Sequence, residues 1–219
     1  MSERMLVTQA LDERDLLVKK IGDKISKIRV VDTKKRNEAK TMTGNKTTEE
    51  FGNTARAAYQ QIIDLIDRYQ RLDRAIVASN AATMLQTGHG QISVAGAIAL
   101  RNRLKGDGIY GTKGNFENLL TDEMEGQYRA GVQAAEIKNR AVESQAETMR
   151  LSILGKDSKS KDEKPLEVVD AYIRENTTEV IDPLDVQKVV QDLREELDLL
   201  MSELDTQIKV SNATTTIEF

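Results

Sequence analysis

TTEEFGNTARAAYQQIIDLIDRYQRLDRAIVASNAAT, residues 47–83, is the stretch that decides the fold, because its apolar and small residues recur at alternating intervals of four and three. These residues are Phe51, Ala55, Ala58, Ile62, Leu65, Tyr69, Leu72, Ile76 and Ser79. An average spacing of about 3.5 residues is typical of a coiled coil. Thr47 is followed three residues later by Glu50, which is the spacing of a capping box. The sequence therefore predicts one long helix from about residue 47 to residue 82.

Other segments carry the same kind of pattern. The spacing predicts a helix over 115–154 and another that begins at Pro183 behind the capping residue Asp182. A first helix over 5–28 and a short one over 93–104 are weaker predictions. In 115–154 the pattern includes Asn139, which either fixes register or oligomeric state or faces a partly wet site. In the last helix the predicted packing seam includes Leu193, Leu197 and Leu200, as Ile62, Leu65 and Tyr69 do in residues 47–83.

A twelve-residue pattern occurs twice, at a constant separation of 132 residues. The first copy is Leu72, Asp73, Ile76, Ser79, Asn80, Ala81 and Thr83, and the second is Leu204, Asp205, Ile208, Ser211, Asn212, Ala213 and Thr215. Either the chain contains a duplication, or two helices end in the same capping sequence; we favour the duplication. Ser and Ala allow close packing, Asn tolerates the left-handed conformation that ends a helix, and Thr favours an extended exit.

The predicted fold is mainly α, with long antiparallel coiled-coil helical hairpins that form a bundle. The two SNA corners are expected to lie close together, with a minor patch of short strands where the β-prone tails behind them gather, including a terminal strand at 214–219. A brief strand is predicted separately at 177–181, and residues 84–92 are predicted to form a short turn region. We expect a helical hairpin with a short helix over 1–105, a Gly-rich joint over 106–114, and a second hairpin over 115–219. The second hairpin, formed by 115–154 with the helix behind Asp182, carries an inserted charged loop at 155–164.

Composition narrows the classes of function. The 31% of charged residues and 4% of aromatic residues are typical of helices packed along narrow apolar seams. A net charge of −4 gives no reason to expect nucleic acid as a partner. The chain has no cysteine, so disulfides, thiolate metal sites and cysteine nucleophiles are excluded. We see neither a signal peptide nor a membrane span, and expect a cytoplasmic protein, or a virion protein if a phage encodes it.

The motifs that suggest chemistry are weak. His89 is the only histidine and lies between two glycines, which favours a turn over a catalytic or metal site. The G-x-G-x-x-G of residues 106–111 follows a predicted helix instead of a strand, so a joint is the better interpretation. Two basic clusters read as solvated loops: Lys34, Lys35, Arg36 and Lys40, and Lys156, Lys159, Lys161 and Lys164.

Two pairs of acidic residues three apart, Asp64 with Asp67 and Glu195 with Asp198, have the spacing used by all-α metal-dependent nucleotide hydrolases. The seams turn both pairs towards water, so we predict no catalytic, cofactor-binding or metal-binding residues, and no cofactor. A nucleotide hydrolase remains an alternative.

Three segments resemble the septicolysin-like family of small bacterial helical proteins. They are residues 76–104 with SNAATML, residues 182–215 with PLDV and SNATT, and an N-terminal pattern of Ala10, Leu11, Glu13, Arg14 and Leu17. The resemblance covers roughly two thirds of the chain, and residues 32–46 and 106–178 are longer than the family pattern, as in an enlarged member. The family name implies a cytolysin, but most members have no known function, so a membrane-active protein is a further alternative. The resemblance supplies no catalytic residue.

From these patterns we expect a non-catalytic structural or assembly protein, such as a component of a phage particle. It would act through helical packing and oligomerisation. The expected partners are a second copy of the chain or other proteins of an assembly, and not nucleic acid or a membrane.

Overall fold

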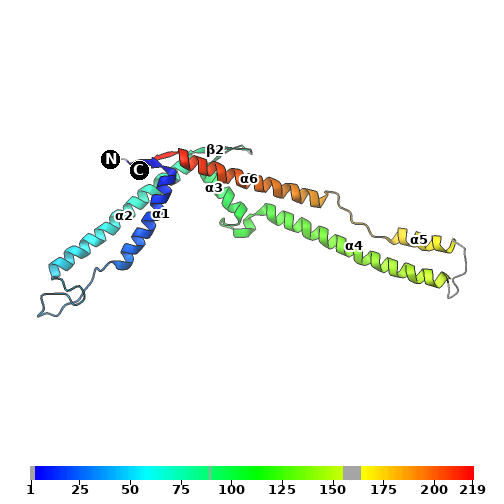
Figure 1. Ribbon diagram of the computed structural model, residues 1–219, viewed down its shortest axis with the longest axis horizontal. Coiled ribbons are helices and arrows are strands. Elements are labelled where there is room, and N and C mark those ends of the chain that lie inside the picture. The colour runs from blue at the N-terminus through cyan, green and yellow to red at the C-terminus, as the bar shows by residue number, and fades with distance from the viewer. Residues whose placement is uncertain (1–2, 89, 155–163) are drawn as a thin grey trace. The chain divides into compact units, whose positions relative to one another are not determined.

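The computed structural model describes residues 3–88, 90–154 and 164–219, and its fold is mainly helical (Figure 1). The helices are α1 (Val7–Lys27), α2 (Thr48–Ala82), α3 (Val94–Lys105), the 3₁₀-helix η1 (Gly111–Gly114), α4 (Phe116–Leu154), α5 (Lys164–Asn176) and α6 (Val186–Thr214). Four short strands accompany them: β1 (Arg4–Leu6), β2 (Met84–Thr87), β3 (Gly90–Ser93) and β4 (Thr216–Glu218). The predicted mainly α class with a small strand patch is confirmed.

The chain divides into two compact units. Unit 1 combines Met1–Asn102 with Leu200–Phe219, and unit 2 is Arg103–Leu199. The sequence-based division placed its joint at 106–114 and kept all later residues together. The structure instead returns the end of α6 to unit 1, because β4 pairs with β1 and not with a segment of unit 2.

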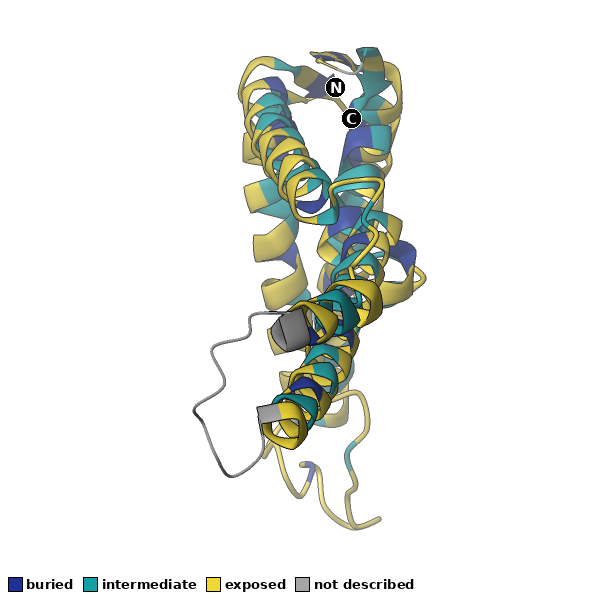
Figure 2. Cartoon of the chain, turned by 90° about the vertical axis from the view of Figure 1, so that its right-hand side faces the viewer, coloured by how far each residue is buried: buried dark blue, intermediate teal, exposed yellow. Residues whose placement is uncertain are grey.

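In unit 1, α1 packs along α2, and Figure 1 shows the two helices side by side. The core between them contains Val7, Ala10, Leu17, Leu72, Ile76 and Ile217, all buried. This core occupies only the part of the two helices nearest the strands. Most of the other residues of the two helices are half-buried or exposed, as the teal and yellow colours in Figure 2 show.

Helix α2 begins as its sequence predicts. The Thr47 hydroxyl accepts a hydrogen bond from the Glu50 amide at 3.2 Å, and the Glu50 carboxylate accepts one from the Thr47 amide at 2.9 Å. The second bond is the main reason why the pKa of Glu50 lies below its usual value. These reciprocal bonds satisfy helix amides that would otherwise have no partner, so the predicted capping box is confirmed.

The strands form two separate antiparallel pairs, β1 with β4 and β2 with β3. The terminal strand expected at 214–219 is therefore present. The brief strand expected at 177–181 is wrong: residues 177–182 belong to no strand. Thr178 instead bonds through its backbone to the Asn139 side chain, which donates to its carbonyl at 3.0 Å and accepts from its amide at 2.7 Å. Asn139 is thus the polar position that holds an extended segment against α4.

In unit 2, α5 is the helix that packs along α4 (Figure 1). Val169 of α5 is fully buried. The sequence predicted a hairpin of 115–154 with the last helix, and α6 forms ion pairs with α4 through Arg194, the shorter one with Glu125 at 2.6 Å. Helix α6 also begins three residues later than predicted, because Pro183–Asp185 form a turn and Asp185 has a positive φ of 53°. Asp182 still accepts from the Val186 amide at 2.9 Å.

Candidate functional site

The two copies of the repeated pattern form equivalent corners in unit 1. Leu72 and Leu204 have no exposed surface, and Ile76 and Ile208 are buried at 2% and 5% exposure. In each corner the Thr amide donates to the Ser carbonyl four residues earlier, at 2.8 Å for Thr83 and at 2.8 Å for Thr215. Each helix then leaves into a short strand. The repeat is therefore a structural unit that ends a helix and starts a strand.

The role expected for the two asparagines is wrong. Among the described residues the only non-glycine residues with positive φ are Asn45 and Asp185, so neither Asn80 nor Asn212 is left-handed. Helix α2 continues beyond Asn80 to Ala82, and the chain leaves it at Thr83 in an extended conformation, with φ −79° and ψ 124°. The β-branched threonine, and not the asparagine, marks the exit because it fits extended backbone well.

The correspondence extends beyond the twelve residues into the strand pairs. Leu85 of β2 lies opposite Ile92, and Ile217 of β4, 132 residues after Leu85, lies opposite Met5. The strand that pairs in each corner then leads directly into a helix. The Val94 amide that starts α3 donates to the Thr83 carbonyl at 2.9 Å, and the Val7 amide that starts α1 donates to the Thr215 carbonyl at 2.9 Å. The pair β2–β3 is thus formed by contiguous chain and the pair β1–β4 by the two ends of the chain. Packing exchanges the helices between the strand pairs, since Leu72 of α2 is buried with Val7 and Ile217 beside β1–β4, and Leu204 of α6 lies with Ile92 beside β2–β3. We therefore call α1, α2 and β1–β4 the first corner, and α3, the end of α6 and β2–β3 the second corner.

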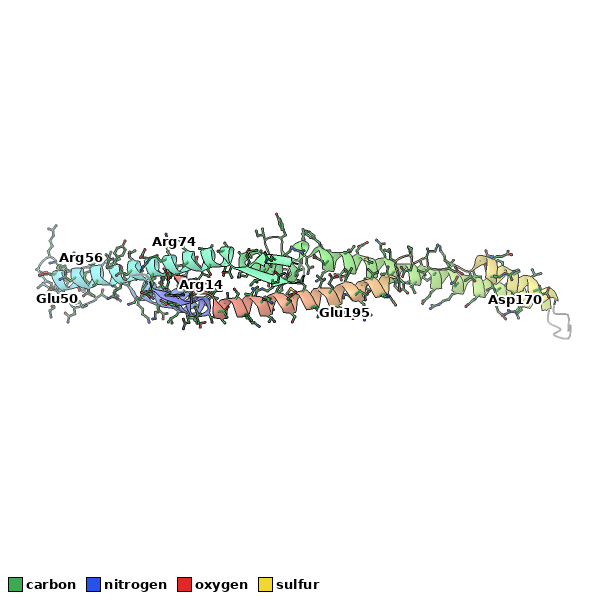
Figure 3. All side chains as sticks on the ribbon, turned by 90° about the horizontal axis from the view of Figure 1, so that it is seen from above. Arg14, Glu50, Arg56, Arg74, Asp170 and Glu195 are labelled. Atoms are coloured by element: carbon green, nitrogen blue, oxygen red, sulfur yellow. The ribbon has the colours of Figure 1, made fainter. Side chains whose placement is uncertain are left out.

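An ion pair completes each corner. Arg14 of α1 pairs with Asp73 of α2 at 3.3 Å, and Arg101 of α3 pairs with Asp205 of α6 at 3.2 Å. Figure 3 labels Arg14 where α1 lies against α2. Sequence reasoning missed this second half of the repeat. Its signal is a shorter pattern, Val-x-x-Ala-[Leu/Ile]-x-x-Arg, which begins at Val7 and again at Val94, 87 residues later.

The first corner is closed by a charged cluster around Arg68. Arg68 of α2 donates to both oxygens of Glu3 at 2.8 Å and also to Glu13, and its guanidinium lies 5.4 Å from the centre of the Phe219 ring. The hydrogen bond from Arg68 lowers the pKa of Glu3, and the bonds to Glu3 and Glu13 raise the pKa of Arg68. The cluster joins β1, α1, α2 and the residue after β4.

The other corner is open at the equivalent place. Leu200 stands where the first corner has Arg68, and Thr87 stands where it has Phe219, by the same separation of 132 residues. Instead of a filled site there is a shallow groove of about 190 Å³, lined by Thr87, Ile92, Leu100, Leu200 and Leu204 among others. Its lining is mainly apolar, with Thr87 and Gln91 as the polar residues, and none of the described lining residues is charged.

The predicted seam residues of the last helix lie differently from those of α2. Ile62 is buried, and Leu65 and Tyr69 are half-buried against the core of unit 1. Leu193, Leu197 and Leu200 are all half-buried, and none of them belongs to that core. In unit 2 a larger groove of about 520 Å³ runs between α4 and the extended segment. Its apolar lining includes Tyr128, Ala135, Val180, Ile181 and Leu184.

Three of the four acidic residues weighed in the sequence interact with side chains of their own helices. Asp64 accepts a hydrogen bond from Gln60 at 2.8 Å, and Asp67 pairs with Arg71 at 3.1 Å. Glu195 accepts from Gln191 at 2.9 Å. Within the part of the chain that the structure describes, no three acidic or histidine side chains gather as a metal site would require. His89, Lys156, Lys159 and Lys161 lie outside the described residues.

No family model, curated protein or solved structure matches this chain. A separate observation concerns membranes: across residues 3–88, 90–154 and 164–219, none of the helices is both long enough and apolar enough to cross a bilayer.

Proposed function

We propose that the protein is a non-catalytic structural protein that acts through helical packing and oligomerisation within a larger assembly, such as a phage particle. The observation that carries the proposal is the number of large apolar side chains left exposed along the helices. Val18 of α1, Tyr59 of α2, Leu119 of α4 and Leu199 of α6 are 54%, 57%, 49% and 72% exposed. Single exposed apolar residues are ordinary, but repeated ones on heptad helices indicate surfaces that pack against another helix.

Energetics support the same proposal. In α1, with 21 residues, the only fully buried side chains are Val7, Ala10 and Leu17. In α2, with 35 residues, they are Ile62, Leu72 and Ile76. Burying one further large apolar side chain stabilises a protein by about 1.5–3 kcal/mol. Association of the helices with further helices into a coiled-coil bundle would therefore gain several such contributions, which a lone pair of helices lacks.

Sedimentation equilibrium of the full chain at micromolar concentrations tests the proposal. We expect a mass of at least twice the 24.5 kDa of one chain, with a concentration dependence that shows association. A mass of one chain over the whole range would contradict self-association. Mg²⁺-dependent turnover of a nucleoside triphosphate that is lost in the Asp64→Asn, Asp67→Asn double variant, or leakage of phospholipid vesicles, would contradict the non-catalytic, non-membrane function.

A further inference from the structure

The two flanks of the α1/α2 pair differ sharply in character. On one flank, Arg68 binds Glu3 and Glu13, and Lys24 donates to Gln61 at 3.0 Å. We call this the polar flank. Its side chains bridge the two helices and satisfy one another, so it offers little to a further partner.

The opposite flank is apolar. We define the apolar flank as Leu11, Val18 and Ile25 of α1 with Tyr59, Ile63, Ile66 and Val77 of α2. Val18, Ile25, Tyr59, Ile63 and Val77 are 54%, 52%, 57%, 39% and 61% exposed, and the other two are half-buried. The nearest ion pair is Arg14 with Asp73, which lies at the seam between the helices and is internally matched.

Helical geometry shows that the apolar face of α2 is wider than its contact with α1 requires. At about 100° per residue, the seam of Ile62, Leu65, Tyr69, Leu72 and Ile76 covers one side of α2. Tyr59, Ile63, Ile66 and Val77 lie on the adjacent side, where Gln70 and Asp73 stand between Ile66 and Val77, so the widened apolar face is continuous from Tyr59 to Ile66. A stripe of about 100° is sufficient for a helix that packs on one core. The remainder of the face fits a second contact.

The duplicated pattern supplies an internal comparison. The positions of α6 that correspond to Tyr59, Ile63, Ile66 and Val77, 132 residues later, are Gln191, Glu195, Asp198 and Lys209. All four are polar and exposed. A helix with the same repeat therefore does not need apolar residues at these positions, and their apolar character in α2 requires its own explanation.

We propose that the apolar flank is the surface through which two copies of this chain associate, α1/α2 pair against α1/α2 pair, into a four-helix core. This deepens the proposed function and rests on it. A second copy fits for two reasons. Residues 11, 18 and 25, and residues 59 and 66, are one heptad apart, and heptad helices pack best against helices with the same repeat. The charges beside the flank, Arg14 and Asp73, pair with each other, so a twofold contact leaves neither of them without an opposite charge.

The size of the flank sets the expected strength. Residues 59–77 extend over about 27 Å at 1.5 Å per residue, and two helices side by side are about 20 Å wide. The resulting face of roughly 540 Å² per copy lies at the low end of specific protein interfaces. The geometry therefore fits a small interface and a reversible dimer.

Charge substitutions on the full chain test the surface. In sedimentation equilibrium we expect the Val18→Glu, Ile63→Glu double variant to shift the association at least tenfold towards the monomer. The matched control is Leu16→Glu, which changes an apolar side chain of 48% exposure two residues from Val18, away from the apolar flank. We expect the control to associate as the wild type does. Circular dichroism of each variant checks that the helices are retained.

The outcomes separate this surface from the proposed function. If the wild type is monomeric, self-association itself is contradicted. If the wild type associates and the double variant associates equally well, the function stands and the apolar flank is not the interface. Equal weakening by Leu16→Glu would also overturn the assignment, because the effect would then not depend on the flank. If the double variant loses its helices, the single variant Val77→Glu, at 61% exposure, replaces it in the comparison with Leu16→Glu.

Discussion

The two corners of unit 1 share their strand register, their buried leucine and their ion pair, but differ in what surrounds them. The first corner, made of α1, α2 and β1–β4, is closed by Arg68, Glu3, Glu13 and Phe219. The second corner, made of α3, the end of α6 and β2–β3, has Leu200 and Thr87 in place of Arg68 and Phe219, and a groove beside Leu204. The residues that the two corners share form the corner itself. The residues that differ determine whether a charged cluster or a groove lies beside it. Closing the first corner joins segments that are far apart in the chain, whereas a hairpin turn already joins β2 to β3.

The buried leucines test whether both corners carry stability. We expect Leu72→Ala and Leu204→Ala each to lower the free energy of unfolding by about 2–5 kcal/mol. Leu72→Ala should cost more, because Leu204 already borders a groove and its surroundings are less tightly packed. Urea denaturation measures both, and Leu199→Ala, at 72% exposure, is the control with an effect of about 0.5 kcal/mol or less. An effect that small at either corner would contradict the equivalence.

The Arg68 cluster tests the difference between the corners. Arg68→Leu gives the closed corner the residue of the open one and leaves the Glu13 carboxylate without this partner. We expect a loss of about 1–2 kcal/mol in the free energy of unfolding, because the hydrogen bonds involve charged groups in a partly buried site. The control is Arg71→Leu, which removes an exposed pair with Asp67 and should cost about 0.5 kcal/mol or less. Equal losses in the two variants would show that the cluster has no special role.

The two ion pairs test the part of the corner that is shared. Double-mutant cycles with Arg14→Ala and Asp73→Ala, and with Arg101→Ala and Asp205→Ala, should each give a coupling energy of about 0.5–1 kcal/mol. The two couplings should agree because both pairs are about equally exposed, with side-chain exposures between 27% and 38%. A measurable coupling energy in only one of the two corners would contradict the equivalence of the two ion pairs.

Lowering the pH is the test with the smallest expected effect, and it acts selectively on the Arg68–Glu3 pair. Arg68 holds the pKa of Glu3 below its ordinary value of 4.5. The stabilisation from this pair is therefore present above that pH and is lost as the pH falls through the lowered pKa. We expect amides of β4 to lose protection from hydrogen exchange relative to those of β2 when both are measured at pH 2.5 and pH 6. An unchanged ratio would contradict the role of Glu3 in closing that corner.

Much of the helical structure could be predicted from local signals. The capping box at Thr47 and the heptads of residues 47–82 depend on neighbours in the chain, and so does the capping bond in which Ser93 accepts from the Gly96 amide at 3.1 Å. The repeat was visible because its residues stand at fixed separations. Its second half was missed because Val7, Ala10 and Arg14 come before both copies whereas Val94, Ala97 and Arg101 come between them, so the two halves of the pattern do not keep one separation along the chain.

Long-range pairing could not be predicted in the same way. Heptads show that a helix has an apolar face, but they do not identify the helix that covers it. The pairing of α5 with α4 and the turn at Pro183–Asp185 depend on such contacts, and so does the bond between Asn139 and Thr178. The apolar flank was hidden for the same reason, since only the placement of α1 shows which half of the face of α2 remains uncovered.

Covalent cross-linking between copies tests most directly the central claim that this protein associates through one flank of its α1/α2 pair. The chain has no cysteine, so a single introduced cysteine reacts alone. Gln70→Cys places a thiol on the exposed side of α2 beside Ile63, Ile66 and Val77, and Asp64→Cys places one on the far side of the same helix. With a short bismaleimide at micromolar protein, we expect a covalent dimer from Gln70→Cys and monomer from Asp64→Cys. Monomer from both, or dimer from Asp64→Cys alone, would contradict the claim.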